Sequence, residues 1–293
     1  LYDLKLPVIG RDRDPHYGLA FDLLSSTSHP VVTGHDSGII TVDLAEGDDV
    51  HREQMRVNMD EPYRTLLGHF RHEIGHYYFY RLVESRPESV AVFSGLFGDP
   101  DADDQSAIDR HYQQGPPAGW DDRYVSAYAT MHPAEDWAET FAHYLHIRST
   151  LDTAAAYGLA PATATYQRKV LGPSAFDTII DMWLPLAWSL NMVNRSMGKP
   201  DLYPFVLPSA VLEKMRLVHE VIDETARQPT AGCTRSALAG CKAHRCPGHV
   251  DPRSRLAPGL AGSRRGCRRL GLHRLLRFQG RRGCFRQRVL RIR

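Results

Sequence analysis

The segment FRHEIGHYY, residues 70–78, places two histidines four positions apart, with a glutamate directly after the first. In an α-helix, residues four apart lie on the same face, about one turn from each other. His72 and His76 could therefore point their ring nitrogens at one divalent ion. Glu73 would lie beside that ion, where its carboxylate could take a proton from a water and help deliver it to a carbonyl carbon. The alternative is that two surface histidines share a helix face by chance.

The residues around this H-E-x-x-H pattern favour a helix from about Glu61 to Glu84. Apolar residues recur there at helical spacing and form one stripe, which comprises Leu67, Phe70, Ile74, Tyr77, Tyr78 and Leu82. Gly75 lies inside the pattern, where it costs about 1 kcal/mol of helix propensity relative to Ala. That cost is easier to understand if another segment of the chain passes close to Gly75.

A catalytic zinc takes three protein ligands and leaves one position for water, so the third ligand has to come from elsewhere. A second helix is predicted from Pro133 to about Gly158, and it carries Glu135, Glu139, His143 and, less well placed, His146 as candidates. Glu135 and Glu139 are again four apart. This spacing suits one carboxylate on the metal and another behind it, holding a ligand histidine by its second ring N–H. Alternatively, these acids form a solvated face near a helix N-terminus.

The remaining pattern up to residue 228 predicts a mainly helical α+β protein with a small sheet. Ile39–Asp43 is rich in β-branched residues and predicts a strand, whereas residues 16–26 predict a short helix. Residues 92–123 are rich in turn formers, and further helices are predicted between 161 and 226. Four tryptophans are expected in the core: Trp120, Trp137, Trp183 and Trp188. No run of 18 apolar residues is present, so we expect no membrane span.

Residues 229–293 have a different composition from the rest of the chain. They contain 16 Arg, one Lys, one Asp and all five cysteines, so the net charge of +2 combines a basic tail with an acidic body. The tail could bind nucleic acid, or hold a metal through Cys241, His244, Cys246 and His249, or be non-native sequence translated out of frame. The abrupt change of composition favours the last interpretation. We therefore expect a domain at 1–228 and a disordered or non-native tail, and the acidic body disfavours a nucleic-acid role for the domain.

Several segments together resemble a bacterial family of zinc-binding metallopeptidases of the gluzincin type. They are YRTLLGHFRHEIGHYYFYRLV, FGD, HYQQGPPAGW, SAYATMHPAEDWAETFAHYLHI and DTA, and the resemblance runs from about Leu19 to Asp223. It implies a zincin-like domain with a small sheet and an active-site helix, one bound Zn²⁺ ion, and a peptide or protein substrate. Members of this family typically carry a cysteine-rich zinc ribbon before the peptidase region, which we expect to be absent here. The N-terminus shows no signal-peptide pattern, so the expected location is cytoplasmic.

A more distant likeness helps to choose the third ligand. In anthrax lethal factor and related gluzincins, a tyrosine precedes the ligand glutamate by seven residues and a second glutamate follows it by four. Tyr128, Glu135 and Glu139 repeat this spacing. The likeness implies that Glu135 binds the metal, that Glu139 supports a ligand histidine, and that Tyr128 donates a hydrogen bond to the oxyanion. Glu139 and His143 remain alternatives for the third ligand.

These observations lead to an expected zinc metallopeptidase, with His72, His76 and Glu135 as metal ligands and Glu73 as general base. In zincins an edge strand also pairs with the extended peptide, and Ile39–Asp43 is the candidate, although an ordinary sheet strand is the simpler interpretation. Two other classes of function remain open. The chain could be a non-catalytic, metal-dependent binding protein, or a nucleic-acid-binding protein that uses its basic tail.

Overall fold

The computed structural model describes residues 1–27, 30–59, 61–102, 110–111, 113–164 and 174–227. The chain divides into two compact units, Leu1–His249 and Val250–Arg293, and every described residue belongs to the first. The Arg- and Cys-rich tail predicted at 229–293 lies outside the described residues, and so do its Cys and His candidates for a metal site. The domain boundary at 228 therefore stays a prediction.

A small mixed sheet lies near the N-terminus. In the described part of the chain it contains β1 (Ala20–Leu24), β2 (Gly34–Asp36) and β3 (Ile39–Asp43), in the order β1-β3-β2. Strand β3 pairs in parallel with β1 and antiparallel with β2. The β2–β3 connection is Ser37-Gly38, and both residues have positive φ, as a two-residue hairpin turn requires.

Strand β1 corrects the short helix expected within residues 16–26. Ala20–Leu24 aligns residue by residue with Ile39–Asp43, and this ladder supplies backbone partners that a local sequence pattern does not reveal. The strand predicted at Ile39–Asp43 is confirmed. Its suggested role as the edge strand is wrong, because β3 is paired on both sides and the sheet ends at β1 and β2.

The helix predicted from Glu61 to Glu84 is confirmed from Leu66 onward. Helix α2 spans Leu66–Phe79 and continues directly as a π-helical turn, Tyr80–Glu84. It begins where it does because the Thr65 side chain accepts a hydrogen bond from the Gly68 N–H at 2.9 Å. Two helices were not predicted, α1 (Asp49–Asn58) and α3 (Pro87–Phe97), and α3 extends into the segment expected to be rich in loops.

The second predicted helix is confirmed as α5 (Pro133–Ala156), with proline in its first turn. Helices α6 (Ser174–Ser196) and α7 (Ser209–Arg227) complete the described part of the chain. Short helical turns connect these elements: Tyr2–Leu4, Leu44–Gly47, Trp120–Asp122, Tyr128–Thr130 and Ala162–Ala164. Among the described residues, no helix combines the length and apolar character needed to cross a membrane.

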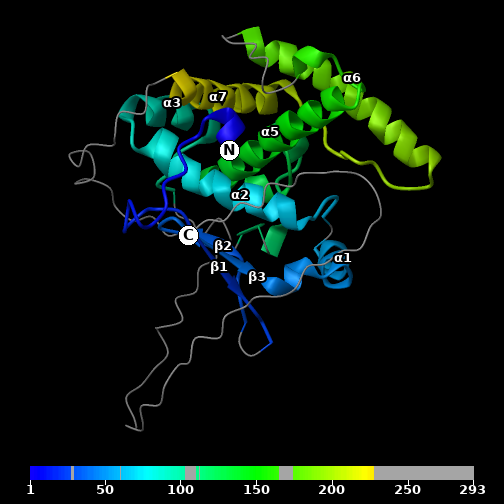
Figure 1. Cartoon of the computed structure of the whole chain (residues 1–293). Coiled ribbons are helices and arrows are strands. Elements are labelled where there is room, and N and C mark those ends of the chain that lie inside the picture. Colours follow the sequence, from blue (N-terminus) through cyan, green and yellow to red (C-terminus); the bar gives the residue numbers. More distant parts are fainter. Residues whose placement is uncertain (28–29, 60, 103–109, 112, 165–173, 228–293) are drawn as a thin grey trace, which may run out of the picture. The chain divides into compact units, whose positions relative to one another are not determined.

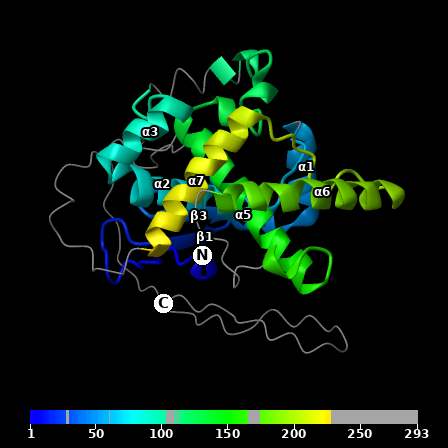
Figure 2. The ribbon, with the colours of Figure 1, turned by 90° about the horizontal axis from the view of Figure 1, so that it is seen from above.

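Helix α2 lies at the centre of this arrangement, between the sheet and α5 (Figure 1). Helix α7 packs against both α3 and α5, as the view from above shows (Figure 2). Aromatic side chains dominate the core between these helices; the fully buried ones include Tyr77, Tyr78, Phe93, Trp137 and Phe141. The predicted fold class is confirmed: the protein is α+β, mainly helical, with a small sheet.

The four tryptophans expected in the core have different environments. Trp137 and Trp183 are buried, as predicted, and Trp120 is half-buried. Trp188 is 66% exposed, so its assignment to the core is wrong. It lies one turn after the exposed Leu184, on the face of α6 opposite the buried Trp183.

Helices α5 and α7 are joined by a buried hydrogen bond between a tyrosine and a histidine. The Tyr144 hydroxyl lies 2.9 Å from His219 Nδ1. Burial lowers the pKa of His219 to about 4, although Asp223 acts in the opposite direction. His219 is therefore neutral in the folded protein at neutral pH.

We expect this histidine to make stability depend on pH between about 6.5 and 4. In this window the unfolded chain binds a proton at residue 219 and the folded chain does not, so the free energy of unfolding falls as the pH decreases. His219→Gln should reduce that fall by about 1–3 kcal/mol. Urea unfolding of both proteins at several pH values measures the effect, and equal slopes in the two proteins would contradict it.

Candidate metal centre

The structure brings His72, His76 and Glu135 together at the contact between α2 and α5. The two histidines lie one turn apart on α2, and Glu135 lies in the first turn of α5. His72 Nε2 is 3.1 Å from His76 Nε2 and 3.0 Å from Glu135 Oε2. His76 Nε2 is 3.5 Å from the same carboxylate oxygen. Two imidazole nitrogens and one carboxylate oxygen therefore converge on one point.

These separations fit a zinc ion. Zinc binds histidine nitrogen and carboxylate oxygen at about 2.0–2.2 Å in tetrahedral geometry, which places neighbouring ligand atoms about 3.3 Å apart. The three separations of 3.0, 3.1 and 3.5 Å lie close to that value. Two neutral nitrogens and one carboxylate also match the donors of a catalytic zinc, which keeps its fourth position for water. The residues present thus fit one Zn²⁺ ion.

Gly75 allows the two helices to approach closely enough to form this centre. A Cβ atom at residue 75 would lie 2.9 Å from the Cα and 3.1 Å from the carbonyl oxygen of Ala138 on α5. The Gly75 carbonyl also accepts a hydrogen bond from Trp137 Nε1 at 2.9 Å. The neighbouring segment that the sequence suggested at Gly75 is therefore helix α5.

Gly75→Ala is expected to lower the free energy of unfolding by up to about 2 kcal/mol. Overpacking costs about 1–3 kcal/mol, and the gain of alanine in helix propensity offsets roughly 1 kcal/mol of that cost. Gly95→Ala is the matched control, because Gly95 also lies in a helix but has no atom within 4 Å of its would-be Cβ. The control should be neutral or stabilising in urea unfolding. A Gly75 variant as stable as the control would contradict the role given to the close helix contact.

Glu139 lies behind His72, on the side away from the proposed ion. Its Oε1 is 2.7 Å from His72 Nδ1, the ring nitrogen that does not face His76. His143, the other alternative ligand, instead contacts the Tyr203 hydroxyl through Nδ1 at 2.8 Å. This placement favours Glu135 as the third ligand and Glu139 as the carboxylate that orients His72, and both assignments remain predictions.

Glu73 is buried beside the two histidines and is 7% exposed. Its Oε2 has no hydrogen-bond partner among the described residues. Burial raises the pKa of Glu73, while the nearby His72 and His76 act to lower it. A carboxylate oxygen that is buried without a partner is unfavourable unless something binds it, so this atom fits a role with a water or substrate.

Comparison with known proteins agrees with this geometry. A family model described as "Putative zinc-binding metallo-peptidase" matches residues 1–221. The chain belongs to this family. The resemblance inferred from the sequence is therefore confirmed.

Relatives of this metallopeptidase-family chain occur in mycobacteria. Uncharacterized proteins of Mycobacterium tuberculosis and Mycobacterium bovis are each 72% identical to it over 226 residues. The match covers 77% of this chain and 66% of each relative, so the chain spans slightly less than two thirds of their length. No solved structure matches the chain.

The charges at the centre suit a divalent cation. Burial favours a neutral carboxyl at Glu135, but His76 and His72 lower its pKa well below the usual value. Burial likewise opposes ionisation of Glu139, yet the hydrogen bond to His72 lowers its pKa to about 2. Burial would lower the pKa of His72, but its contacts with the two carboxylates raise it well above the usual value. A binding ion would therefore displace a proton from His72, and affinity should fall in acid.

Tyr128 lies next to the centre on the short helical turn Tyr128–Thr130. Its ring centroid is 5.7 Å from that of His72, with the two planes at 67°. The side chain is 38% exposed, so it lies at the boundary between the site and solvent. This position suits a hydroxyl that contacts a substrate, and the role itself remains a prediction.

An ion pair that the sequence pattern did not indicate involves Asp136, the residue that follows Glu135 on α5. Asp136 Oδ2 lies 2.6 Å from Lys214 Nζ, and both side chains are buried. Lys214 also donates a hydrogen bond to the Arg123 carbonyl at 2.8 Å. Burial raises the pKa of Asp136 to about 7, although Lys214 opposes this shift. One feature of the sequence could have indicated this pair: Lys214 lies three residues after Val211, on the apolar stripe of α7.

A second missed residue is His35 on β2. Its ring is nearly parallel to that of His76, with centroids 6.3 Å apart. His35 Nε2 accepts a hydrogen bond from the Gly38 N–H at 3.1 Å, which links the β2–β3 turn to this histidine. Nothing in the local sequence indicated that β2 would lie against α2, the helix that carries His72 and His76.

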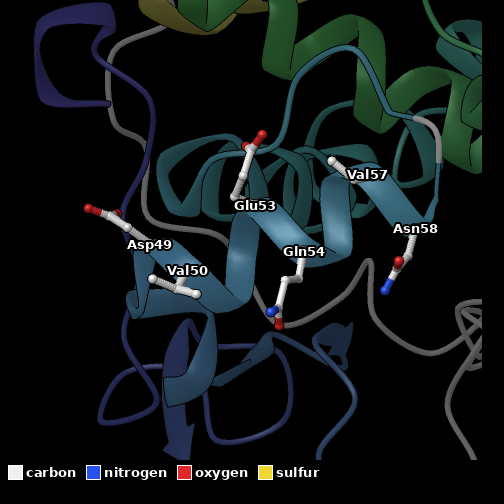
Figure 3. Close-up of a pocket in the computed structure, with 6 residues that line it drawn as sticks. All are labelled: Asp49, Val50, Glu53, Gln54, Val57 and Asn58. Carbon is white, nitrogen blue, oxygen red and sulfur yellow. The ribbon is translucent and has the colours of Figure 1, made fainter.

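A pocket on α1 lies apart from this chemistry (Figure 3). Its six lining residues all come from that helix: Asp49, Val50, Glu53, Gln54, Val57 and Asn58. None of them belongs to the candidate metal centre, so the pocket carries no part of the functional argument.

Proposed function

We propose that this chain is a zinc-dependent hydrolase that cleaves peptide bonds in peptides or proteins. The observation that carries the proposal is the convergence of His72 Nε2, His76 Nε2 and Glu135 Oε2 within 4.8 Å of one another. Membership of a family described as zinc-binding metallo-peptidases supports the same conclusion. Zinc held by these residues would polarise the scissile carbonyl and make a nearby water more acidic.

The chain's own residues supply the proton transfers and the positioning. Glu73 would accept a proton from the attacking water and later give it to the leaving amine nitrogen as the C–N bond breaks. The Tyr128 hydroxyl would donate a hydrogen bond to the carbonyl oxygen as that oxygen becomes negative. Glu139 would hold His72 in the required orientation through Nδ1. The products are a new carboxylate and a new amine.

Strand β2 is the sheet edge nearest to this chemistry, and it replaces β3 as the candidate to bind substrate. It ends the sheet on one side, and its His35 contacts the ring of His76. An extended peptide could add to this edge by backbone hydrogen bonds and pass over the centre. The proposal therefore favours unfolded or flexible segments as substrates, because folded segments do not offer a free strand.

The proposal is tested with the full chain and a complex peptide mixture. Peptides from a digested proteome are incubated with zinc-loaded protein, with chelator-treated protein, and with chelator-treated protein that has been given zinc again. New peptide N-termini, detected by mass spectrometry, should form only in the two samples that contain zinc. Cleavage that persists after zinc removal, or no cleavage by protein with one bound zinc, would overturn the proposal.

A further inference from the structure

Ser126 links Glu139, the carboxylate that contacts His72, to the turn that carries Tyr128. Its hydroxyl donates a hydrogen bond to Glu139 Oε2 at 2.7 Å and accepts one from the Ala129 N–H at 3.1 Å. The other oxygen of Glu139 accepts from His72 Nδ1 at 2.7 Å. One hydroxyl therefore contacts both the carboxylate behind the metal centre and the backbone of the turn Tyr128–Thr130.

The turn is also fixed from its other side. Val125 and Ala129 are 3% and 1% exposed and pack against Val211 of α7. Lys214 of the same helix bonds the Arg123 carbonyl just before them. While α7 packs against the apolar side of the turn, Ser126 bonds Glu139 of α5 next to its polar side. That bond links the backbone of the turn to the carboxylate that contacts His72.

The same bond restricts Glu139. A carboxylate with one oxygen bonded can still rotate about its side chain, whereas Glu139 has both oxygens engaged, by His72 and by Ser126. A fixed carboxylate fixes the ring of the histidine that it accepts from, and so fixes where the other ring nitrogen points. Groups of this kind around a metal centre change metal affinity or activity by about 10–100-fold when they are removed.

We propose that Ser126 is a positioning residue that couples the orientation of His72 to the placement of the Tyr128 hydroxyl. The proposal rests on the proposed function, because it assigns His72 to the metal and Tyr128 to the substrate. It adds a link that the sequence pattern does not contain, since Ser126 acts through Glu139 and through the backbone of Ala129.

Zinc affinity tests the first half of this coupling. Ser126→Ala in the full chain should weaken zinc binding about tenfold in competition with a chromophoric chelator. Ser126→Thr keeps a hydroxyl and should restore affinity close to that of the wild type. Ser189→Ala is the matched control, because that serine donates to the Pro185 carbonyl on an exposed face of α6. Wild-type affinity in the Ser126→Ala protein would overturn the proposal.

A double variant shows whether Ser126 acts through Glu139. If it does, Ser126→Ala should weaken zinc binding in the wild-type background and have no further effect once Glu139 is alanine. An equal, independent loss in both backgrounds would overturn the coupling. If Glu139→Ala binds zinc as the wild type does, the support of His72 by Glu139 and the role of Ser126 both fail, whereas the three ligands of the proposed centre stand. If Glu139→Ala binds weakly and Ser126→Ala binds normally, only the role of Ser126 fails.

A spectroscopic signature separates positioning from a general loss of folding. Cobalt(II) placed in the site reports ligand geometry through its visible absorption bands. Ser126→Ala should shift these bands and Ser126→Thr should return them, while circular dichroism of both variants stays that of the wild type. Unchanged bands in a folded Ser126→Ala protein would overturn the proposal.

Discussion

Glu73→Gln is expected to keep one bound zinc and to lose about 10²–10⁴-fold in turnover. Glutamine has nearly the same shape as glutamate, and the three side chains proposed to hold the ion are those of His72, His76 and Glu135. Glutamine cannot accept the proton from the attacking water. The chemistry should therefore fail while the metal stays in place.

The measurement combines elemental analysis with initial rates on a peptide found to be cleaved. Because Glu73 is buried, thermal unfolding of the variant is compared with that of the wild type, so that a folding defect is recognised. Glu220→Gln, on an exposed position of α7, is the control for the change of charge. A folded, zinc-loaded Glu73→Gln protein with wild-type turnover would favour a non-catalytic metal-binding role or a different base.

Glu135→Ala and Glu139→Ala are expected to differ sharply in zinc content. Removal of Glu135 leaves two histidines as the only protein ligands, so the purified protein should contain no stoichiometric zinc after gel filtration. Removal of Glu139 leaves all three ligands and should weaken binding by about 10–100-fold without abolishing it. Metal analysis at a fixed free zinc concentration distinguishes the two results.

Two further variants complete this comparison. Glu135→Gln keeps the size of the side chain but removes its charge, so its zinc content shows whether the carboxylate itself is needed. His143→Ala should retain zinc, because His143 Nδ1 contacts Tyr203. If Glu139→Ala loses all metal and Glu135→Ala keeps it, the two assignments are reversed: Glu139 is the ligand and Glu135 is not.

The parts of the fold that depend on local patterns were predicted from the sequence. Helix α5 has proline in its first turn and ends at Ala156, close to the end predicted at Gly158. Helix α2 has an apolar stripe and carries the two histidines on one face. Strand β1 was missed because its pairing partner lies elsewhere in the sequence, and the segment alone has a helical pattern. The exposure of Trp188 was missed for a related reason, since composition does not say which face of α6 meets the core.

The residues of the candidate site also fall into those that a local pattern predicts and those that depend on contacts between distant segments. His72, Glu73 and His76 follow from spacing on a single helix, whereas the choice of Glu135 over Glu139 needed the family resemblance. Ser126, Lys214 and His35 were not found, because each acts through a contact between segments that are far apart in the sequence or through a backbone group. Contacts of this kind leave no periodic pattern in a sequence.

The placement of the ligands on two separate helices has a consequence for the lifetime of the protein. An ion bound by His76 and Glu135 would hold together two positions that are far apart in the sequence. The segment between them contains α3 and the turn Tyr128–Thr130. Because these ligands meet only in the folded chain, an ion bound to the native form alone would shift the folding equilibrium toward that form. When zinc is scarce, we therefore expect this protein to lose its proposed activity and also to unfold and be degraded sooner.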